Sequence, residues 1–219
     1  MSDLPDKPKI VEIRRVDANQ SLPKGYDLID QGTVDGVKKP KALALPSGFV
    51  AHFDVPPGWQ KDRDPFNRTF SSCVPTNELH VGMKIEDIGL PVAPEDVPHM
   101  KKLFNSKNLT LSSTDLVFLQ KAINYGSTQR IIIQSARVHD IGRGERVIDF
   151  IGRYNYPNTT NYCLRCCLLD IDWTSRFLEP ITFTAPPDRF NKYMPQVDKI
   201  FASMVTVSQY PPYRKPLGF

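Results

Sequence analysis

Three of the four cysteines are close together in the segment Cys163-Leu-Arg-Cys166-Cys167, which contains a CxxC spacing. This spacing can bind zinc or carry thiol redox chemistry. A structural zinc site needs four ligands, but the chain offers no second CxxC and no paired histidine. On a strand, Cys163 and Cys167 point to one face and Cys166 to the other, which separates the ligands. A redox CxxC belongs at a helix N-terminus, whereas this segment has the pattern of a strand. We therefore predict that the three cysteines are small buried residues of the core or of a sheet face. We predict that the protein binds no metal and no cofactor.

Two carboxylates, Asp170 and Asp172, lie two residues apart at the end of the same predicted strand, so they can share a face. Paired carboxylates bind metal ions or perform acid–base catalysis, but no third ligand is identifiable, and a solvated strand end explains them as well. Gly142-Arg-Gly144 joins two strands and opens no helix, which indicates a hairpin turn rather than a nucleotide-binding loop. No G-x-S-x-G elbow is present, and the histidines are scattered over different elements: His52, His80, His99 and His139. We therefore predict no catalytic residue and no enzymatic activity.

Aromatic and arginine side chains at strand ends are the better functional candidates, because protein interfaces favour these residue types at their centres. The predicted interface consists of Tyr154, Tyr156, Trp173, Arg176 and Phe177, with Arg153 nearby. A second interpretation is that Trp173 and Phe177 fold back to cover the edge of a sheet.

The sequence of the C-terminal half predicts the sheet that positions these residues. β-branched and apolar runs over 130–138, 146–154, 162–172 and 181–184, separated by turns, predict an antiparallel meander. A helix follows, because apolar residues recur at helical spacing in one stripe: Phe190, Met194, Val197, Phe201 and Met204. Pro195 removes one backbone hydrogen bond, so we expect a kink or a restart of the helix there.

The preceding segment supplies further strands over 48–55, 69–74 and 79–85, and two helices over about 94–106 and 112–126. Ser112 and Asp115 have the spacing of a capping box, and Gly126 is placed as a C-cap glycine. Residues 1–47 are expected to form a loosely structured arm with one short strand at 10–13, and residues 208–219 an extended Pro-rich tail. Residues 48–207 then make one domain. We predict an α+β fold, an antiparallel sheet flanked by helices in an α/β/α sandwich.

This order of elements resembles the PsbP/Mog1/DcrB-like superfamily. The resemblance rests on three segments: Gly48-Phe-Val-Ala-His-Phe-Asp-Val-Pro-Pro-Gly-Trp59, the hairpin from Gly142 to Tyr154, and the terminal helix Phe190-x-x-Tyr193-x-Pro195-x-Val197. It implies a protein that binds other proteins, such as photosystem subunits, a small GTPase or secreted toxins, and it supplies no shared catalytic residues. The acidic GTPase-binding pattern of Mog1 and a transit peptide are both missing. The resemblance therefore favours a bacterial member of unassigned function.

Composition narrows the functional classes. The net charge of +4 is dispersed without a block of basic residues, which argues against nucleic-acid binding. No apolar stretch is long enough for a membrane span, and the N-terminus lacks the apolar region of a signal peptide, so we expect a cytoplasmic protein. Sequons at Asn67, Asn108 and Asn158 keep secretion as an alternative. The sequence predicts a non-enzymatic protein-binding module: a bacterial accessory, secretion-chaperone or immunity-type protein. A hydrolase or thiol enzyme, or a protein that binds a small hydrophobic ligand, is the alternative.

Overall fold

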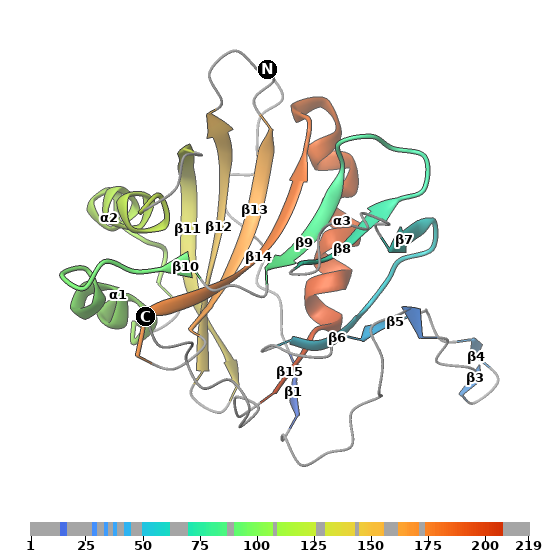
Figure 1. Ribbon diagram of the computed structural model, residues 1–219, viewed down its shortest axis with the longest axis horizontal. Coiled ribbons are helices and arrows are strands. Elements are labelled where there is room, and N and C mark those ends of the chain that lie inside the picture. The colour runs from blue at the N-terminus through green and yellow to red at the C-terminus, as the bar shows by residue number, and fades with distance from the viewer. Residues whose placement is uncertain are drawn as a thin grey trace.

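The structure is a computed structural model (Figure 1). It describes the following residues: 14–16, 28–29, 33–34, 37–38, 42–44, 50–61, 70–86, 90–106, 109–125, 130–142, 145–155, 162–170 and 174–207. The expected α+β fold built on an antiparallel sheet is confirmed. Among the described residues, no helix is both long and apolar enough to cross a membrane.

An eight-stranded sheet forms the centre of the molecule, in the order β11-β12-β13-β14-β9-β8-β7, with β10 pairing against the beginning of β14. Every pairing in it is antiparallel, and the predicted meander is confirmed as its first four strands. The strands are β7 (Trp59–Lys61), β8 (Phe70–Pro75), β9 (Gly82–Glu86), β10 (Leu90–Pro91), β11 (Arg130–Gly142), β12 (Glu145–Asn155), β13 (Cys163–Asp170) and β14 (Phe177–Ala185).

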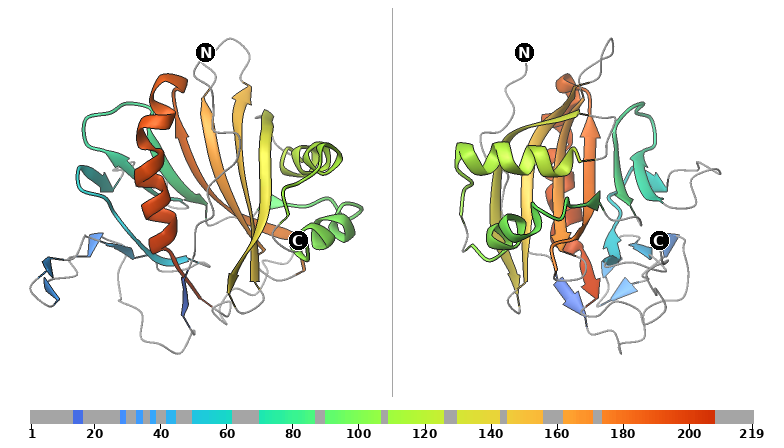
Figure 2. Two further views of the ribbon diagram at one scale, coloured as in Figure 1. Left: turned by 180° about the vertical axis from the view of Figure 1, so that it is seen from behind. Right: turned by 60° about the vertical axis from the view of Figure 1, so that its left-hand side comes forward.

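Helices pack on both faces of this sheet, and alternate residues of each central strand point to opposite sides (Figure 2). On β13, Cys163, Cys167 and Leu169 belong to the core on the side of helix α3. Leu164, Cys166 and Leu168 belong to the core on the side of helices α1 and α2. β13 is therefore buried on both faces, which explains its nearly continuous apolar sequence.

The two helices α1 (Val97–Phe104) and α2 (Ser113–Ile123) are those predicted, with shorter bounds. Pro98 lies in the first turn of α1, where its missing N–H removes no helical hydrogen bond. The predicted cap of α2 is confirmed, because Ser112 Oγ accepts a hydrogen bond from the Asp115 backbone N–H at 3.2 Å. Lys121 Nζ of α2 donates to Asp96, the N-cap of α1, at 3.0 Å, which joins the two helices.

Helix α3 (Pro187–Ser203) carries four residues of the predicted apolar stripe, and the fifth, Met204, is its C-cap; all five are buried. The helix passes through Pro195 as one element and does not restart there, whereas the kink that we expected as the other possibility stays a prediction. Pro195 lies on the exposed side of α3, where the irregularity it imposes does not disturb packing against the sheet.

A buried ionic network fixes α3 to the sheet. Arg165 of β13 is fully buried, and its Nε and Nη2 donate to the two carboxylate oxygens of Asp149 on β12 at 3.1 and 2.8 Å. Its Nη1 donates to Asp198 of α3 at 2.5 Å. The guanidinium also lies 4.8 Å from the ring centre of Phe201. One side chain thereby links two strands and a helix.

Two strands begin three or four residues away from their predicted starts, and β11 ends at Gly142 rather than at residue 138. The strand expected from residue 79 begins at Gly82, because residues 76–80 form a turn in which His80 has a φ of 64°. Leu79 is consequently 77% exposed and does not join the apolar alternation of β9. β14 begins at Phe177 rather than 181 and includes Pro180. Pro180 lies where the outer neighbour of β14 changes from β10 to β9, a position at which a missing N–H is tolerated.

A smaller sheet has the order β1-β15-β6-β5-β2, and β3 pairs with β4. Its strands are β1 (Arg14–Val16), β2 (Leu28–Ile29), β3 (Thr33–Val34), β4 (Val37–Lys38), β5 (Ala42–Ala44), β6 (Val50–Asp54) and β15 (Val205–Val207). β6 confirms the strand expected at 48–55. The strand expected at 10–13, the C-cap at Gly126 and the tail from 208 lie outside the described residues. The domain boundary at residue 48 stays a prediction.

Candidate functional site

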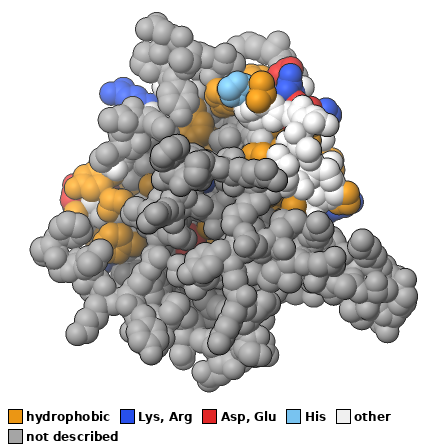
Figure 3. All heavy atoms as spheres, turned by 45° about the vertical axis from the view of Figure 1, so that its right-hand side comes forward, with side chains coloured by type: hydrophobic (Ala, Val, Ile, Leu, Met, Phe, Trp, Pro, Cys, Tyr) orange, Lys and Arg blue, Asp and Glu red, His pale blue; other side chains and the backbone are white. Residues whose placement is uncertain are grey.

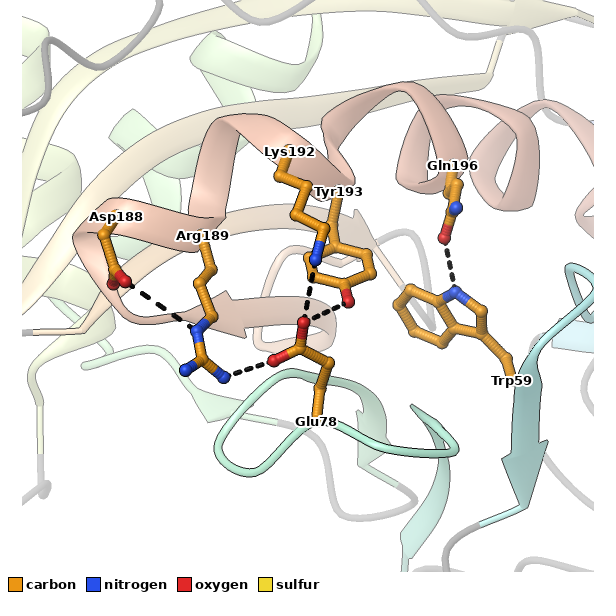
Figure 4. A network of polar contacts seen from close by, with 7 residues as sticks. All are labelled: Trp59, Glu78, Asp188, Arg189, Lys192, Tyr193 and Gln196. Atoms are coloured by element: carbon orange, nitrogen blue, oxygen red, sulfur yellow. Dashed lines mark hydrogen bonds and ion pairs between the residues drawn. The ribbon is translucent and has the colours of Figure 1, made fainter.

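One carboxylate, that of Glu78 in the turn between β8 and β9, accepts hydrogen bonds from three side chains of α3 (Figure 4). Lys192 Nζ donates to Oε1 at 2.9 Å, and Tyr193 Oη donates to the same oxygen at 2.8 Å. Arg189 donates to Oε2 and also lies 3.7 Å from Asp188. The three donors occupy positions i, i+3 and i+4 of the helix, so they share one face and reach a single point.

Neighbouring contacts hold the same region together. Trp59, which begins β7, donates its indole N–H to Gln196 Oε1 of α3 at 2.5 Å (Figure 4). Its ring lies edge-on to Tyr193 with the ring centres 5.9 Å apart. Gly58, with a φ of 81°, accepts hydrogen bonds from both the backbone N–H and the hydroxyl of Thr76. The turn at 76–80 is therefore tied to both α3 and the start of β7. We call this arrangement the Glu78 clamp.

The electrostatics of the Glu78 clamp stabilise its charged state. Hydrogen bonds from Lys192 and Tyr193 hold the pKa of Glu78 below its ordinary value. The hydrogen bond to Glu78 raises the pKa of Lys192, and burial together with Glu78 raises the pKa of Tyr193. A general acid or base works best with a pKa near the operating pH, and these three groups are displaced away from neutrality. The arrangement fits a structural ion-pair cluster better than a proton-transfer site.

What the Glu78 clamp presents to solvent is an apolar side chain. Leu79 is 77% exposed, more than any other large hydrophobic residue among those described. The next residue, His80, is exposed and has its ring centre 5.8 Å from that of Tyr162. Figure 3 shows hydrophobic side chains beside a histidine on this side of the molecule, next to a group of acidic and basic side chains. The turn thus exposes the apolar side chain of Leu79 on a side of the molecule that also carries charged side chains.

The cysteines behave as predicted. Cys163, Cys166 and Cys167 are buried free thiols on β13, and Cys166 points to the opposite face from the other two. Burial raises the pKa of Cys163, and burial together with Asp149 raises that of Cys167 well above the ordinary value. Within the described part of the chain, no group of three His, Cys, Asp or Glu side chains could hold a metal ion.

Asp170 has a structural role at the end of β13. Its carboxylate accepts hydrogen bonds from the Ser175 backbone N–H at 3.0 Å and from the Ser175 hydroxyl at 2.8 Å. Ser175 is fully buried and has a φ of 58°, so the carboxylate fixes a strained turn. Asp172 lies outside the described residues, and the pairing of the two carboxylates therefore stays a prediction.

The predicted interface residues do not form one cluster where they are described. Tyr154 is at the end of β12 and packs against the core on the α1 and α2 side. Arg176 and Phe177 are exposed at the start of β14, which lies at the opposite end of the sheet. Tyr156 and Trp173 lie outside the described residues. The role of this set in binding stays a prediction.

A Ser–Asp–His arrangement occurs between α1 and α2, but its order is not that of a catalytic triad. The Asp115 carboxylate is in the middle, accepting from Ser112 Oγ at 2.7 Å and lying 3.2 Å from His99 Nε2. The hydrogen bond from Ser112 holds the pKa of Asp115 below its ordinary value. Because the serine donates to the carboxylate rather than to the imidazole, the arrangement differs from a triad, in which the histidine accepts the serine proton. The His99 ring stacks on Phe118 with ring centres 3.8 Å apart, so the group joins the two helices.

The Glu78 clamp was not predicted from the sequence. The one available signal was the set of polar residues at i, i+3 and i+4 on the solvent side of the predicted terminal helix, and such a set usually indicates a solvated face. Its carboxylate partner is 111 to 115 residues away in the sequence, between the strands predicted at 69–74 and 79–85. No local pattern could connect the two.

Comparison with known proteins does not add a family to this description. No protein-family model matches the sequence. No curated protein matches it either.

Proposed function

We propose that this chain is a non-enzymatic protein-binding module, an α/β/α sandwich of the PsbP/Mog1/DcrB-like kind, with a partner that contacts the turn held by the Glu78 clamp. The resemblance in the opening strand, the hairpin and the terminal helix supports the family. A cytoplasmic bacterial accessory, secretion-chaperone or immunity-type role follows from the same resemblance and is proposed with it.

The observation that carries this proposal is the exposed Leu79 on a turn fixed by three side chains of α3. An exposed apolar residue on a fixed turn loses little conformational entropy when a partner covers it, which favours binding. Glu78, the residue before Leu79, is bonded to Arg189 and Lys192 of α3, and charged side chains of this kind are typical of the polar rim of a protein interface. This combination is typical of a docking point for another protein.

A thiol enzyme is the alternative from the sequence, and the described geometry favours it less. A nucleophilic cysteine needs a lowered pKa and an accessible sulfur, whereas the thiols of Cys73, Cys163 and Cys167 are buried with raised pKa values. A hydrolase based on Asp170 would need its carboxylate free for a substrate, but both oxygens already accept hydrogen bonds from Ser175.

Site-specific photo-crosslinking in cells that produce the full chain tests the proposal. A photoreactive amino acid at position 79 should capture a defined partner, and the captured protein should then bind the purified chain directly. The Leu79→Asp variant should lose this binding, because it places a charge at the apolar centre of the contact.

Val117 provides the matched control, since it is 70% exposed and lies on α2 rather than on the clamped turn. A crosslinker at position 117 should not capture the same protein, and Val117→Asp should bind it normally. Equal capture from both positions, or unchanged binding by the Leu79→Asp variant, would overturn the proposal.

A further inference from the structure

Among the described strands β11 is the last of the large sheet, so one side of its backbone pairs with none of them. Such an edge presents unpaired N–H and C=O groups to which another chain can pair. β11 is 13 residues long, and proteins usually keep exposed edges much shorter than this. The outward backbone groups of β11 therefore need partners.

Helix α2 supplies two of these partners through side-chain amides. Asn124, at the C-cap of α2, accepts a hydrogen bond from the Ile131 N–H at 2.8 Å and donates to the Ile131 carbonyl at 2.9 Å. Gln120, one helical turn earlier, accepts a hydrogen bond from the Ile133 N–H at 2.9 Å. The Asn124 amide thus makes the same pair of hydrogen bonds that a residue of an adjacent antiparallel strand would make.

The spacing explains why a helix can take this place. Residues four apart on a helix are separated by about 6 Å along its axis, at 1.5 Å per residue. Residues two apart on a strand, which point their backbone groups to the same side, are separated by roughly 6.7 Å. Gln120 and Asn124 therefore match Ile133 and Ile131 in register.

Residues 109–111, which precede α2, also bond to the outward side of β11, through backbone hydrogen bonds. The Leu111 N–H donates to the Ala136 carbonyl at 3.0 Å, and the Val138 N–H donates to the Leu109 carbonyl at 2.9 Å. Thr110 forms an antiparallel bridge with Arg137. The chain from 109 to 124 thus runs along β11 from 138 back to 131, in the direction of an antiparallel neighbour. A β-bulge between Ile133 and Ser135 separates the two parts of this cover.

We infer that residues 109–124 act as a substitute edge strand, and that Gln120 and Asn124 prevent β11 from pairing with β11 of a second copy of this chain. We expect a second copy to bind the edge once it is exposed, because two copies of β11 related by a two-fold axis would run antiparallel. This is the same kind of pairing that β11 makes with β12. This inference is independent of the proposed binding function, since α2 and the Glu78 clamp pack against opposite faces of the sheet.

The test uses a shape-conserving double variant of the full chain, Gln120→Met with Asn124→Leu. The apolar side chains match the amides in size and keep α2 helical, but they cannot bond to the strand, so α2 can move away from the edge of β11. Size-exclusion chromatography with light scattering should show a monomer for the unaltered protein and a concentration-dependent doubling of mass for the variant. Amide hydrogen exchange should show Ile131 and Ile133 protected in the dimer and exchanging faster on dilution to the monomer.

Single variants keep the inference open to refutation if the double variant does not fold. Asn124→Ala should accelerate exchange of the Ile131 amide about tenfold without a similar change at Ile133, and Gln120→Ala should do the reverse. Val117→Ala, on the exposed side of the same helix, should change neither amide. A folded double variant that stays monomeric at high concentration would overturn the inference, as would single variants that leave both amides equally protected.

Discussion

Replacing Arg165 by methionine should destabilise the protein severely, because it leaves the Asp149 carboxylate buried without its partner. Both side chains have no solvent exposure, and Arg165 provides two hydrogen bonds to this carboxylate. Removing one member of a buried ion pair typically costs about 3–5 kcal/mol. Asp198, the second partner, is 17% exposed and can be hydrated, so its loss adds little. We therefore expect a decrease of about 3–5 kcal/mol in the free energy of unfolding.

Urea denaturation followed by circular dichroism measures this change in the free energy of unfolding. A second substitution shows whether the loss comes from the missing ion-pair attraction or from the buried Asp149 charge that is left without a partner. The double variant Asp149→Leu with Arg165→Met removes both charges and should recover most of the stability, because apolar replacement of a buried pair is often close to neutral. Arg176→Met is the matched control at an exposed position and should change stability by less than about 0.5 kcal/mol.

The pH dependence of the Arg165→Met variant gives an independent check. Burial raises the pKa of Asp149 even in the intact protein, where Arg165 opposes the effect, so removal of Arg165 raises it further. A carboxyl with a higher pKa in the folded state than in the unfolded state destabilises the fold as the pH rises through that range. The stability difference between intact protein and variant should therefore narrow as the pH falls. A loss below about 1 kcal/mol, or a double variant worse than the single one, would refute this reasoning.

Four further results are expected. Glu78→Gln should lower the melting temperature at neutral pH. The difference should shrink as the pH falls below the ordinary glutamate pKa of about 4.3 and vanish below the lowered folded-state pKa, because the carboxyl loses its stabilising contribution as it is protonated. The four buried thiols should resist a thiol reagent in the native protein and react in denaturant, as followed by absorbance. Gly152→Ala should cost about 1–3 kcal/mol in urea denaturation, because the added Cβ would lie 2.4 Å from the Ile132 carbonyl oxygen. Ser112→Ala should cost about 1 kcal/mol in the same assay through loss of the α2 cap.

Elements governed by local periodicity were predictable from the sequence. The apolar stripe of α3 and the alternation of β13 depend only on spacing along one segment, and both are confirmed. The strand at residues 79–85 was predicted too long because Leu79 fits a period of two, although it is exposed on a turn. The left-handed backbone of His80, which ends that alternation, has no sequence signal comparable to a glycine.

The polar networks were beyond prediction because their partners are distant in sequence. Arg165 stands alone as a charged residue within an apolar run, and its partners are 16 and 33 residues away on different elements. The whole meander lies between Glu78 and α3 in the sequence. Sequence patterns describe which face of an element is buried, but they do not specify which charges of separate elements meet there.

The position of β14 has a consequence for folding during synthesis. This strand joins the meander to the hairpin of β8 and β9, and Ile85 of that hairpin pairs with Ile181. Ile181 is synthesised only after α1, α2 and the four strands β10 to β13. The apolar side of this hairpin, which includes Met83 and Ile85, therefore stays exposed until β14 and α3 have been synthesised. Such late, non-local pairing slows folding and exposes the intermediate to aggregation. The emerging chain is thus expected to depend on chaperones until the strand from Phe177 to Ala185 leaves the ribosome.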